Sequence, residues 1–300
     1  MDEASATGRP IPLVGKWHET ATAGEPMTSS PTFRDISLPP AAPAASKRLL
    51  RPRRDLPFHP ASDAHPLLAA HGGVLTVERL GTVPYSPTWE LQDELAGQRR
   101  ERRTGDRLLL LEHFPVYTIG RGGDEANLLA GPERLRQLGA EFIRIDRGGD
   151  ITFHGPGQLV AYPIVELRDP LDLRRYVRTL EAAIIQTAAA FGITAVRVDG
   201  LTGVWVEGER KLAAIGVRVR RGVTTHGLAL NVNTELRWFD EMIPCGIRDK
   251  DVTSLAHELG HAVPMEEVET ELARALADGF GLKTADGRPG SAGPAGSTEQ

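Results

Sequence analysis

One long amphipathic helix between two groups of strand-like segments constrains the fold more than any other feature of this sequence. From Leu171 to Gly192 the apolar residues recur every three or four positions, and the glycine supplies a stop. Segments rich in β-branched, leucine and aromatic residues precede it at 74–80, 107–113, 141–146 and 158–167, and follow it at 195–198, 203–208, 212–221 and 225–233. Further helices are indicated at 252–259 and 265–280. Grouped strands with segregated helices predict an α+β fold with antiparallel hairpins.

The two ends of the chain have a different composition. Eleven of the 22 prolines lie between Pro10 and Pro66, in a stretch without a sustained apolar period. Such a stretch buries too little apolar surface to offset its chain entropy. We therefore expect a disordered extension over 1–70, a folded domain over 71–283 and a flexible Gly/Ala-rich tail over 284–300.

Charge and hydropathy exclude several classes of function. The net charge of −5 gives no basic field for a phosphate backbone, so nucleic acid is not an expected partner. The longest uncharged helical stretch, 182–196, is shorter than the roughly 20 apolar residues of a membrane span. The N-terminus has no basic patch followed by an apolar core. We expect a cytoplasmic protein that does not bind membranes.

A glycine-rich segment, residues 147–158 (RGGDITFHGPGQ), lies between two predicted strands. Its four glycines allow positive φ and let a ligand approach backbone N–H groups closely. It matches neither the phosphate-binding nor the dinucleotide-binding glycine pattern. A ligand-binding loop and a tight connection with a hydrogen-bonded His154 both remain open from the residues alone.

Cys245 is the single cysteine, so a disulfide framework and a multi-cysteine zinc site are excluded. It lies in a polar loop ahead of a predicted helix, with Arg248 and Lys250 close in sequence. At an ordinary pKa near 8.5 only about 3% of a thiol is ionised at pH 7, so a cationic neighbour would favour its reactivity. Lys211, at the start of an apolar strand, is a candidate neighbour. A buried inert thiol and a solvated hairpin lysine are the alternatives.

Residues 257–261 spell HELGH, the pattern by which two histidines on one helix face hold zinc. Gly260 favours the end of a helix, and Pro264 favours the start of the next one. His257 and His261 are then not expected to share a face, and we predict no metal site.

Four motifs taken together resemble one enzyme family. RGGDITFHGPGQLVAYPIVEL, GVWVEGERKLAAIGVRV, THGLALNVNTEL and IPCGI followed by DVTSL occur in the order found in the octanoyl-acyl-carrier-protein:protein octanoyltransferases. The likeness covers about residues 74–282. It implies an α+β domain like that of the biotin and lipoate protein ligases, with a mixed, largely antiparallel sheet flanked by helices.

The resemblance also implies roles for individual residues. Cys245 is expected to be the acyl-thioester nucleophile and Lys211 its basic partner. The substrate-binding residues implied are Arg147, Gly148, Gly149, Asp150, Ile151, Thr152, Phe153, His154, Ala214, Ile215, Gly216, Gly227, Leu228 and Ala229. Many family members have serine where this chain has Ala214.

The activity implied is transfer of an octanoyl group from octanoyl-acyl-carrier protein to a lysine, the first step of endogenous protein lipoylation. The acceptors implied are the lipoyl domains of 2-oxoacid dehydrogenase complexes and the glycine cleavage H protein. Thioester exchange followed by amide formation needs no ATP, and no cofactor is expected. The alternatives are an ATP-dependent lipoate or biotin ligase, a zinc hydrolase using HELGH, and a non-catalytic domain that binds carrier proteins.

Overall fold

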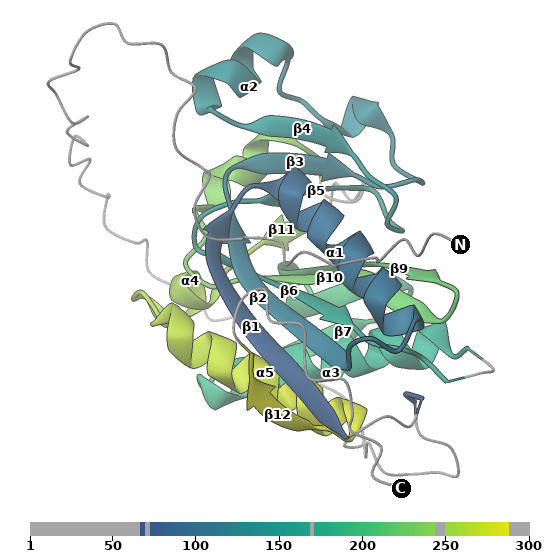
Figure 1. The fold of residues 1–300 in the computed structure, drawn as a ribbon. Helices are drawn as coiled ribbons and strands as arrows, with labels where there is room; N and C mark the ends of the chain where they lie inside the picture. Colours follow the sequence, from purple (N-terminus) through teal and green to yellow (C-terminus); the bar gives the residue numbers. More distant parts are fainter. Residues whose placement is uncertain (1–66, 70–72, 169–170, 244–249, 288–300) are drawn as a thin grey trace, which may run out of the picture. The chain divides into compact units, whose positions relative to one another are not determined.

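The computed structural model describes residues 67–69, 73–168, 171–243 and 250–287. Most strands of this part form one large sheet, with the order β12-β1-β2-β6-β10-β9-β8-β7 (Figure 1). Its strands are β1 (Val74–Val83), β2 (Asp106–His113), β6 (Gln158–Ile164), β7 (Ala195–Val198), β8 (Leu201–Val206), β9 (Arg210–Arg220), β10 (Val223–Asn231) and β12 (Lys283–Asp286). The short β11 (Asp251–Val252) pairs with the start of β9.

Both pairing directions occur in this sheet. β1 is parallel to β12 and to β2, and β11 is parallel to β9. The pairs from β2 through β6, β10, β9 and β8 to β7 are antiparallel. The prediction of a mixed, largely antiparallel sheet flanked by helices is confirmed.

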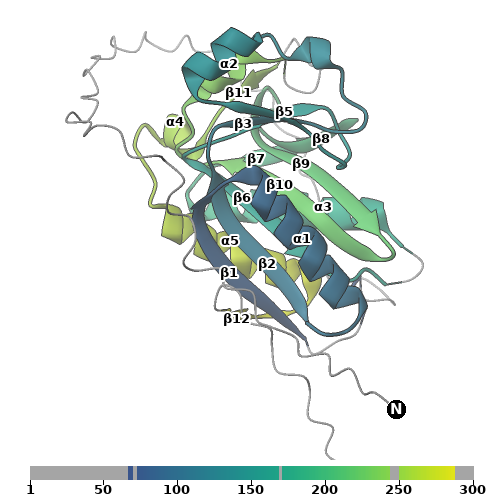
Figure 2. The same cartoon turned by 45° about the horizontal axis from the view of Figure 1, so that its top comes forward.

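Helices pack on both faces of the sheet. On one face lies α1 (Tyr85–Arg100), over β6 and β10, and on the other lie α3 (Leu173–Ala190) and α5 (Met265–Phe280) (Figure 2). One buried cluster fills the space between the sheet and α3 and α5, and a smaller one lies under α1. No helix in the described ranges is long and apolar enough to cross a membrane.

A second sheet has the order β4-β3-β5. It is formed by β3 (Val116–Ile119), β4 (Glu141–Arg144) and β5 (Ile151–His154). The 3-10 helix η1 (Glu125–Asn127) and α2 (Pro132–Leu138) lie between β3 and β4 in the sequence. Side chains of α2 and of the 3-10 helix η2 (Leu236–Glu241) pack in the buried cluster of this sheet. β5 belongs to the glycine-rich segment 147–158, and the end of this segment leads directly into β6 of the large sheet. The segment therefore connects the two sheets. Sequence analysis placed a strand at 141–146 but did not identify β3, β5, α1 or α2.

The described residues extend beyond both expected boundaries of the folded domain. Leu67 and Leu68 lie inside the range expected to be an extension, yet both are buried, and Leu68 forms a bridge with Leu167. Strand β12 lies in the range expected to be a tail and pairs with β1. Leu68 and β12 thus pair with described parts of the domain, and the boundaries at 70 and 283 stay a prediction.

Candidate active site

A cavity of about 620 Å³ opens between the glycine-rich segment and strands β9 and β10. Nearly every residue that the sequence motifs suggested lines it: Arg147, Gly148, Gly149, Asp150, Ile151, Thr152, His154, Lys211, Ala214, Ile215, Gly216, Gly227, Leu228 and Ala229. Segments far apart in the sequence thus meet at one place. Their contact with a substrate stays a prediction.

Phe153 is the exception among these residues. Its ring stacks on Trp238 at 4.9 Å between centroids and lies 5.2 Å from the ring of Tyr117. The side chain is fully buried in the cluster that fills the small sheet. Phe153 therefore supports β5 from behind and is not among the cavity residues.

The cavity extends around a free edge of β9. β8 pairs with β9 only as far as Val204 and Ala213, with a register shift at that point. Beyond it, the edge of β9 receives the glycine-rich loop, where the Gly148 N–H donates to the Val217 carbonyl at 3.0 Å. At this point Gly203 allows the backbones of β8 and β9 to approach closely, since a Cβ there would lie 2.6 Å from the Ala213 carbonyl oxygen.

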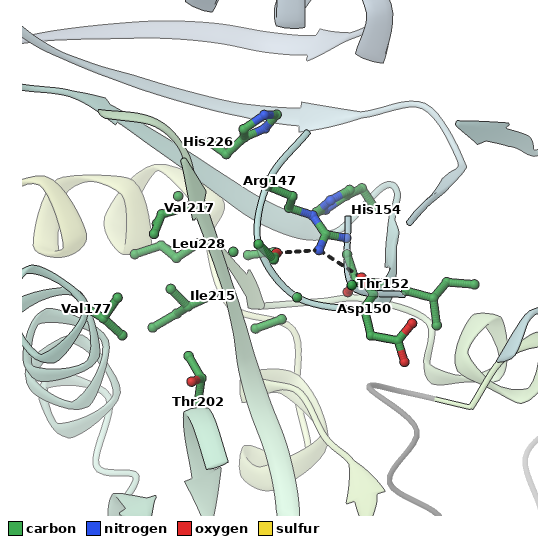
Figure 3. A pocket seen from close by; sticks show the side chains of 18 of the residues that line it. Arg147, Asp150, Thr152, His154, Val177, Thr202, Ile215, Val217, His226 and Leu228 are labelled. Carbon is green, nitrogen blue, oxygen red and sulfur yellow. Dashed lines mark hydrogen bonds between the residues drawn. The ribbon is translucent and has the colours of Figure 1, made fainter. Parts of the chain in front are cut away.

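Two sides of the cavity can therefore be distinguished in Figure 3. Arg147, Asp150 and His154 lie on one side of the strand ribbon that crosses the view, which we call the loop side. Val177 of α3 and Ile215 lie on the other, which we call the α3 side. The first is rich in polar groups, and the second is mostly apolar, with Thr202 as a labelled polar residue.

Arg147 holds the glycine-rich loop in shape. Its Nη1 donates to the carbonyl oxygens of Gly148 and Asp150 at 3.0 and 2.8 Å, and its Nη2 donates to the carbonyl and hydroxyl oxygens of Thr118, both at 2.9 Å. The residue is only 6% exposed. These bonds tie the loop to β3, which makes Arg147 a positioning residue.

The carboxylate of Asp150 also acts within the protein. Its Oδ1 accepts the Asp124 N–H at 3.1 Å, and its Oδ2 accepts the side-chain amide of Asn127 at 2.6 Å. Asp150 thus joins the glycine-rich loop to the segment that follows β3. Both charged residues of this loop shape the wall of the cavity through protein contacts.

Lys211 is buried where β9 begins. Its Nζ lies 5.2 Å from the centre of the Trp205 ring, a cation–π distance. Its backbone pairs with Val252 of β11, and it lines a small recess together with Met242 and Val252. Cys245 is in the segment between those two residues and lies outside the described residues. The recess is thus lined by one residue that comes before Cys245 in the sequence and by one that comes after it.

His154 takes part in a chain of hydrogen bonds behind the recess. Gln158 donates its amide N–H groups to Phe153 O and Asn231 Oδ1, so its Oε1 must accept from His154 Nδ1, at 2.8 Å. His154 Nε2 then carries the lone pair. Burial lowers the pKa of His154 well below its ordinary value, so the ring is neutral at pH 7.

Two polar rings that line the cavity, Tyr85 and Tyr162, were not identified from the sequence, and the buried His113 contacts both. Tyr85 stacks on His154, and Tyr162 donates to Nε2 of the buried His113 at 2.9 Å, since His113 Nδ1 must donate to the Val83 carbonyl. Burial lowers the pKa of His113 to about 4. Tyr85 and His113 have no motif around them, so only the fold brings them here.

His226 is a further cavity residue with unusual geometry. It has a φ of 57° inside β10, and Gln92 of α1 accepts its backbone N–H at 2.7 Å. Its Nε2 lies 3.1 Å from Asp146, and burial lowers its pKa. A left-handed non-glycine residue in a strand is strained, and such strain is concentrated at functional sites. Its place before Gly227 in the THGLALN motif was a signal in the sequence.

The HELGH segment has the predicted helix break. Helix α4 (Leu255–Leu259) ends at Gly260, whose φ is 77°. Both oxygens of Glu258 accept from Arg210, at 2.9 and 3.0 Å, and Glu258 Oε1 also accepts from Thr253. Among the described residues, no three His, Cys, Asp or Glu side chains gather as a metal-ligand group.

Comparison with known proteins gives the family of the chain. The profile of the lipoyl protein ligase A/B catalytic domain matches residues 84–277, more than half of the sequence. The chain belongs to this family. The resemblance inferred from the motifs is confirmed. The prediction that the protein is an acyltransferase of this family is confirmed as well.

Relatives within this family are octanoyltransferases. The chain is 51% identical over 220 residues to the octanoyltransferase of Rubrobacter xylanophilus, covering 72% of this chain and 96% of the relative. It is 50% identical over 212 residues to that of Chloroflexus aggregans, covering 70% and 96%.

Solved lipoate-protein ligases share the fold. Lipoate-protein ligase A bound with ATP superposes with a TM-score of 0.58 at 19% identity, over 73% of this chain and 89% of the ligase. A putative lipoate protein ligase from T. acidophilum with bound lipoic acid gives 0.57 at 17% identity, over 71% and 88%. At these identities the likeness shows the architecture alone.

Proposed function

We propose that this protein transfers an octanoyl group from octanoyl-acyl-carrier protein to a lysine of a lipoyl domain, through a thioester on Cys245. The acceptors proposed are the lipoyl domains of 2-oxoacid dehydrogenase complexes and the glycine cleavage H protein. The octanoyltransferases that are about half identical to it over 220 and 212 residues support this activity.

The observation that carries the proposal is the position of Lys211. Its side chain lines both the main cavity and the recess formed with Met242 and Val252. These two residues come shortly before and after Cys245 in the sequence. A cation there favours ionisation of a nearby thiol because it stabilises the thiolate.

The reaction has two transfers. The Cys245 thiolate attacks the thioester carbonyl of the donor, a new C–S bond forms, and the carrier thiolate leaves and takes up a proton. The amine of the acceptor lysine then attacks the Cys245 thioester, an amide C–N bond forms, and the C–S bond breaks. Both steps exchange one acyl bond for another, and the amide product makes the second step favourable.

The cavity offers groups for each part of this sequence. Lys211 stabilises the thiolate while charged and, after losing a proton, accepts one from the attacking amine. The glycine-rich segment brings backbone N–H groups close to the reacting carbonyl, where they would stabilise the oxyanion. His154 is proposed to orient the acyl group, since its Nδ1 is already bound to Gln158.

The test compares two substrates on the full chain. Octanoyl-acyl-carrier protein and free octanoate with ATP and Mg²⁺ are each incubated with a lipoyl domain, and the mass of the domain is measured. The proposal predicts an octanoyl gain from the carrier thioester without ATP. A gain only from octanoate with ATP would instead establish a ligase.

A further inference from the structure

The α3 side of the cavity contains an apolar hollow that the proposed chemistry has not used. Its walls are Leu173 and Val177 of α3, Leu201 of β8, and Ile215 and Leu228 of the sheet. Ile215 and Leu228 are opposite each other in the β9–β10 register. Figure 3 shows Val177, Ile215 and Leu228 on the same side of the strand ribbon.

The hollow exists because α3 does not cover this part of the sheet completely. Val177 and Ile215 are only partly buried, whereas Leu180, one turn further along α3, is fully buried against the sheet. At the mouth Leu173 is 46% exposed. The apolar surface is thus open to a ligand that enters from the cavity.

Distance along β9 relates this hollow to the reacting group. Four residues separate Lys211 from Ile215, and a strand rises about 3.3 Å per residue, which places Ile215 about 13 Å from Lys211. The seven carbon–carbon bonds of an octanoyl group, at about 1.5 Å each, reach at most about 11 Å. A chain whose carbonyl lies beside Lys211 therefore ends about 2 Å short of the level of Ile215, where its terminal methyl group can still contact the Ile215–Leu228 pair.

The two sides of the cavity differ in what they offer to such a chain. On the loop side, the wall is formed by the polar side chains of Arg147, Asp150 and His154 and offers an alkyl chain little apolar surface. On the α3 side, the walls include the apolar side chains of Val177, Ile215 and Leu228, and Thr202 is the polar side chain labelled beside them. Burial of methylene groups is favourable there.

We infer that the α3 hollow receives the distal end of the acyl chain and that Val177 is the residue that sets the accepted chain length. This inference rests on the proposed octanoyl transfer. Val177 lies on the helix opposite the Ile215–Leu228 pair, so the size of its side chain determines how far the chain extends. The substrate class is a saturated, unbranched acyl thioester.

The test measures kcat/KM for carrier protein loaded with hexanoyl, octanoyl, decanoyl and dodecanoyl groups. In Val177→Ala the removed methyl groups make room, and the decanoyl-to-octanoyl ratio should rise about tenfold, since two more buried methylenes correspond to at most about 15-fold. In Val177→Phe the hexanoyl-to-octanoyl ratio should rise about tenfold because the hollow is filled. The two variants thus shift the profile in opposite directions.

Gln186→Phe is the matched control, because Gln186 is exposed on the same helix and does not line the cavity. Its chain-length profile should equal that of the unchanged protein. Val177→Ala favours helix formation, so the test can be read even if Val177→Phe folds poorly.

An unchanged profile in Val177→Ala, or an equal loss for all chain lengths, overturns the inference while octanoyl transfer itself remains. If the unchanged protein transfers no octanoyl group from the carrier, the proposed function fails and the inference fails with it. The two results are distinguished within the same set of assays.

Discussion

Replacing Arg147 by methionine tests whether this residue holds the loop or binds substrate. The guanidinium donates to the carbonyl oxygens of Gly148 and Asp150 in the loop and to the carbonyl and hydroxyl oxygens of Thr118 of β3. Methionine has a similar length but cannot donate. The substitution therefore removes the bonds and leaves buried carbonyl groups without these donors.

The expected loss of stability follows from those bonds. A hydrogen bond from a charged donor contributes about 1.5–3 kcal/mol, but contributions within one network do not add fully, and the loop can relax toward solvent. We expect the free energy of unfolding to fall by about 3 kcal/mol. For a domain of this size that corresponds to a decrease in Tm of about 6–12 °C.

The assay is urea unfolding at pH 7, together with kcat/KM for octanoyl transfer. Arg144→Met is the control, because Arg144 is exposed and its ion pair with Glu125 lies in solvent. Such a pair contributes less than about 1 kcal/mol. If Arg147→Met has unchanged stability and only a higher KM, Arg147 binds substrate and its assignment as a positioning residue is wrong.

Three further predictions concern other parts of the domain. As the pH is lowered from about 6.5 to about 4, the free energy of unfolding should fall by up to about 3 kcal/mol because of His113 alone. In this window the imidazole of the unfolded chain takes up a proton. The buried ring does not, because its pKa is lowered to about 4. Urea midpoints should show a smaller decrease in His113→Gln, and an equal decrease would refute this source. Gly227→Ala should lower the free energy of unfolding by about 1–3 kcal/mol, because its Cβ would lie 2.1 Å from the Ala161 carbonyl oxygen, whereas Gly105→Ala, with open space around it, should not. Deleting residues 1–66 should leave the thermal transition unchanged. Deleting residues 1–70 should lower the free energy of unfolding by about 3 kcal/mol, because the buried Leu67 and Leu68 are lost. Equal transitions for the two truncations would contradict the place of these leucines in the core.

Helix α1 shows why part of the fold could not be predicted from sequence. The helices α3 and α5 carry regular apolar stripes, and both were identified. The buried face of α1 instead includes Thr88, Gln92 and Arg99, which have no apolar period. Arg99 is buried because it pairs with Asp106 at 2.7 Å, and Gln92 because it accepts the His226 N–H. Tertiary partners stabilise this helix, and two of them, Glu166 of the Arg99 ion pair and His226, are far away in the sequence.

Strand β12 and Phe153 illustrate the same limit on a smaller scale. All four residues of β12 are exposed, so its sequence has no alternation of apolar and polar residues that would predict a strand. Backbone pairing with β1 fixes its position. Phe153 belongs to a motif whose other members line the cavity, but its side chain enters the core of the small sheet. Motifs identified the site, whereas the direction of each side chain required the fold.

The central claim is that Cys245 holds the acyl group, and the mass of the intact protein tests it most directly. After incubation with octanoyl-acyl-carrier protein and without acceptor, the protein should gain one octanoyl group, which peptide mapping should assign to Cys245. Cys245→Ala should gain no mass and modify no acceptor, and Lys211→Ala should acylate much more slowly at pH 7. If Cys245→Ala transfers octanoyl groups to the lipoyl domain at the rate of the unchanged protein, no cysteine thioester forms on the pathway and the account is wrong.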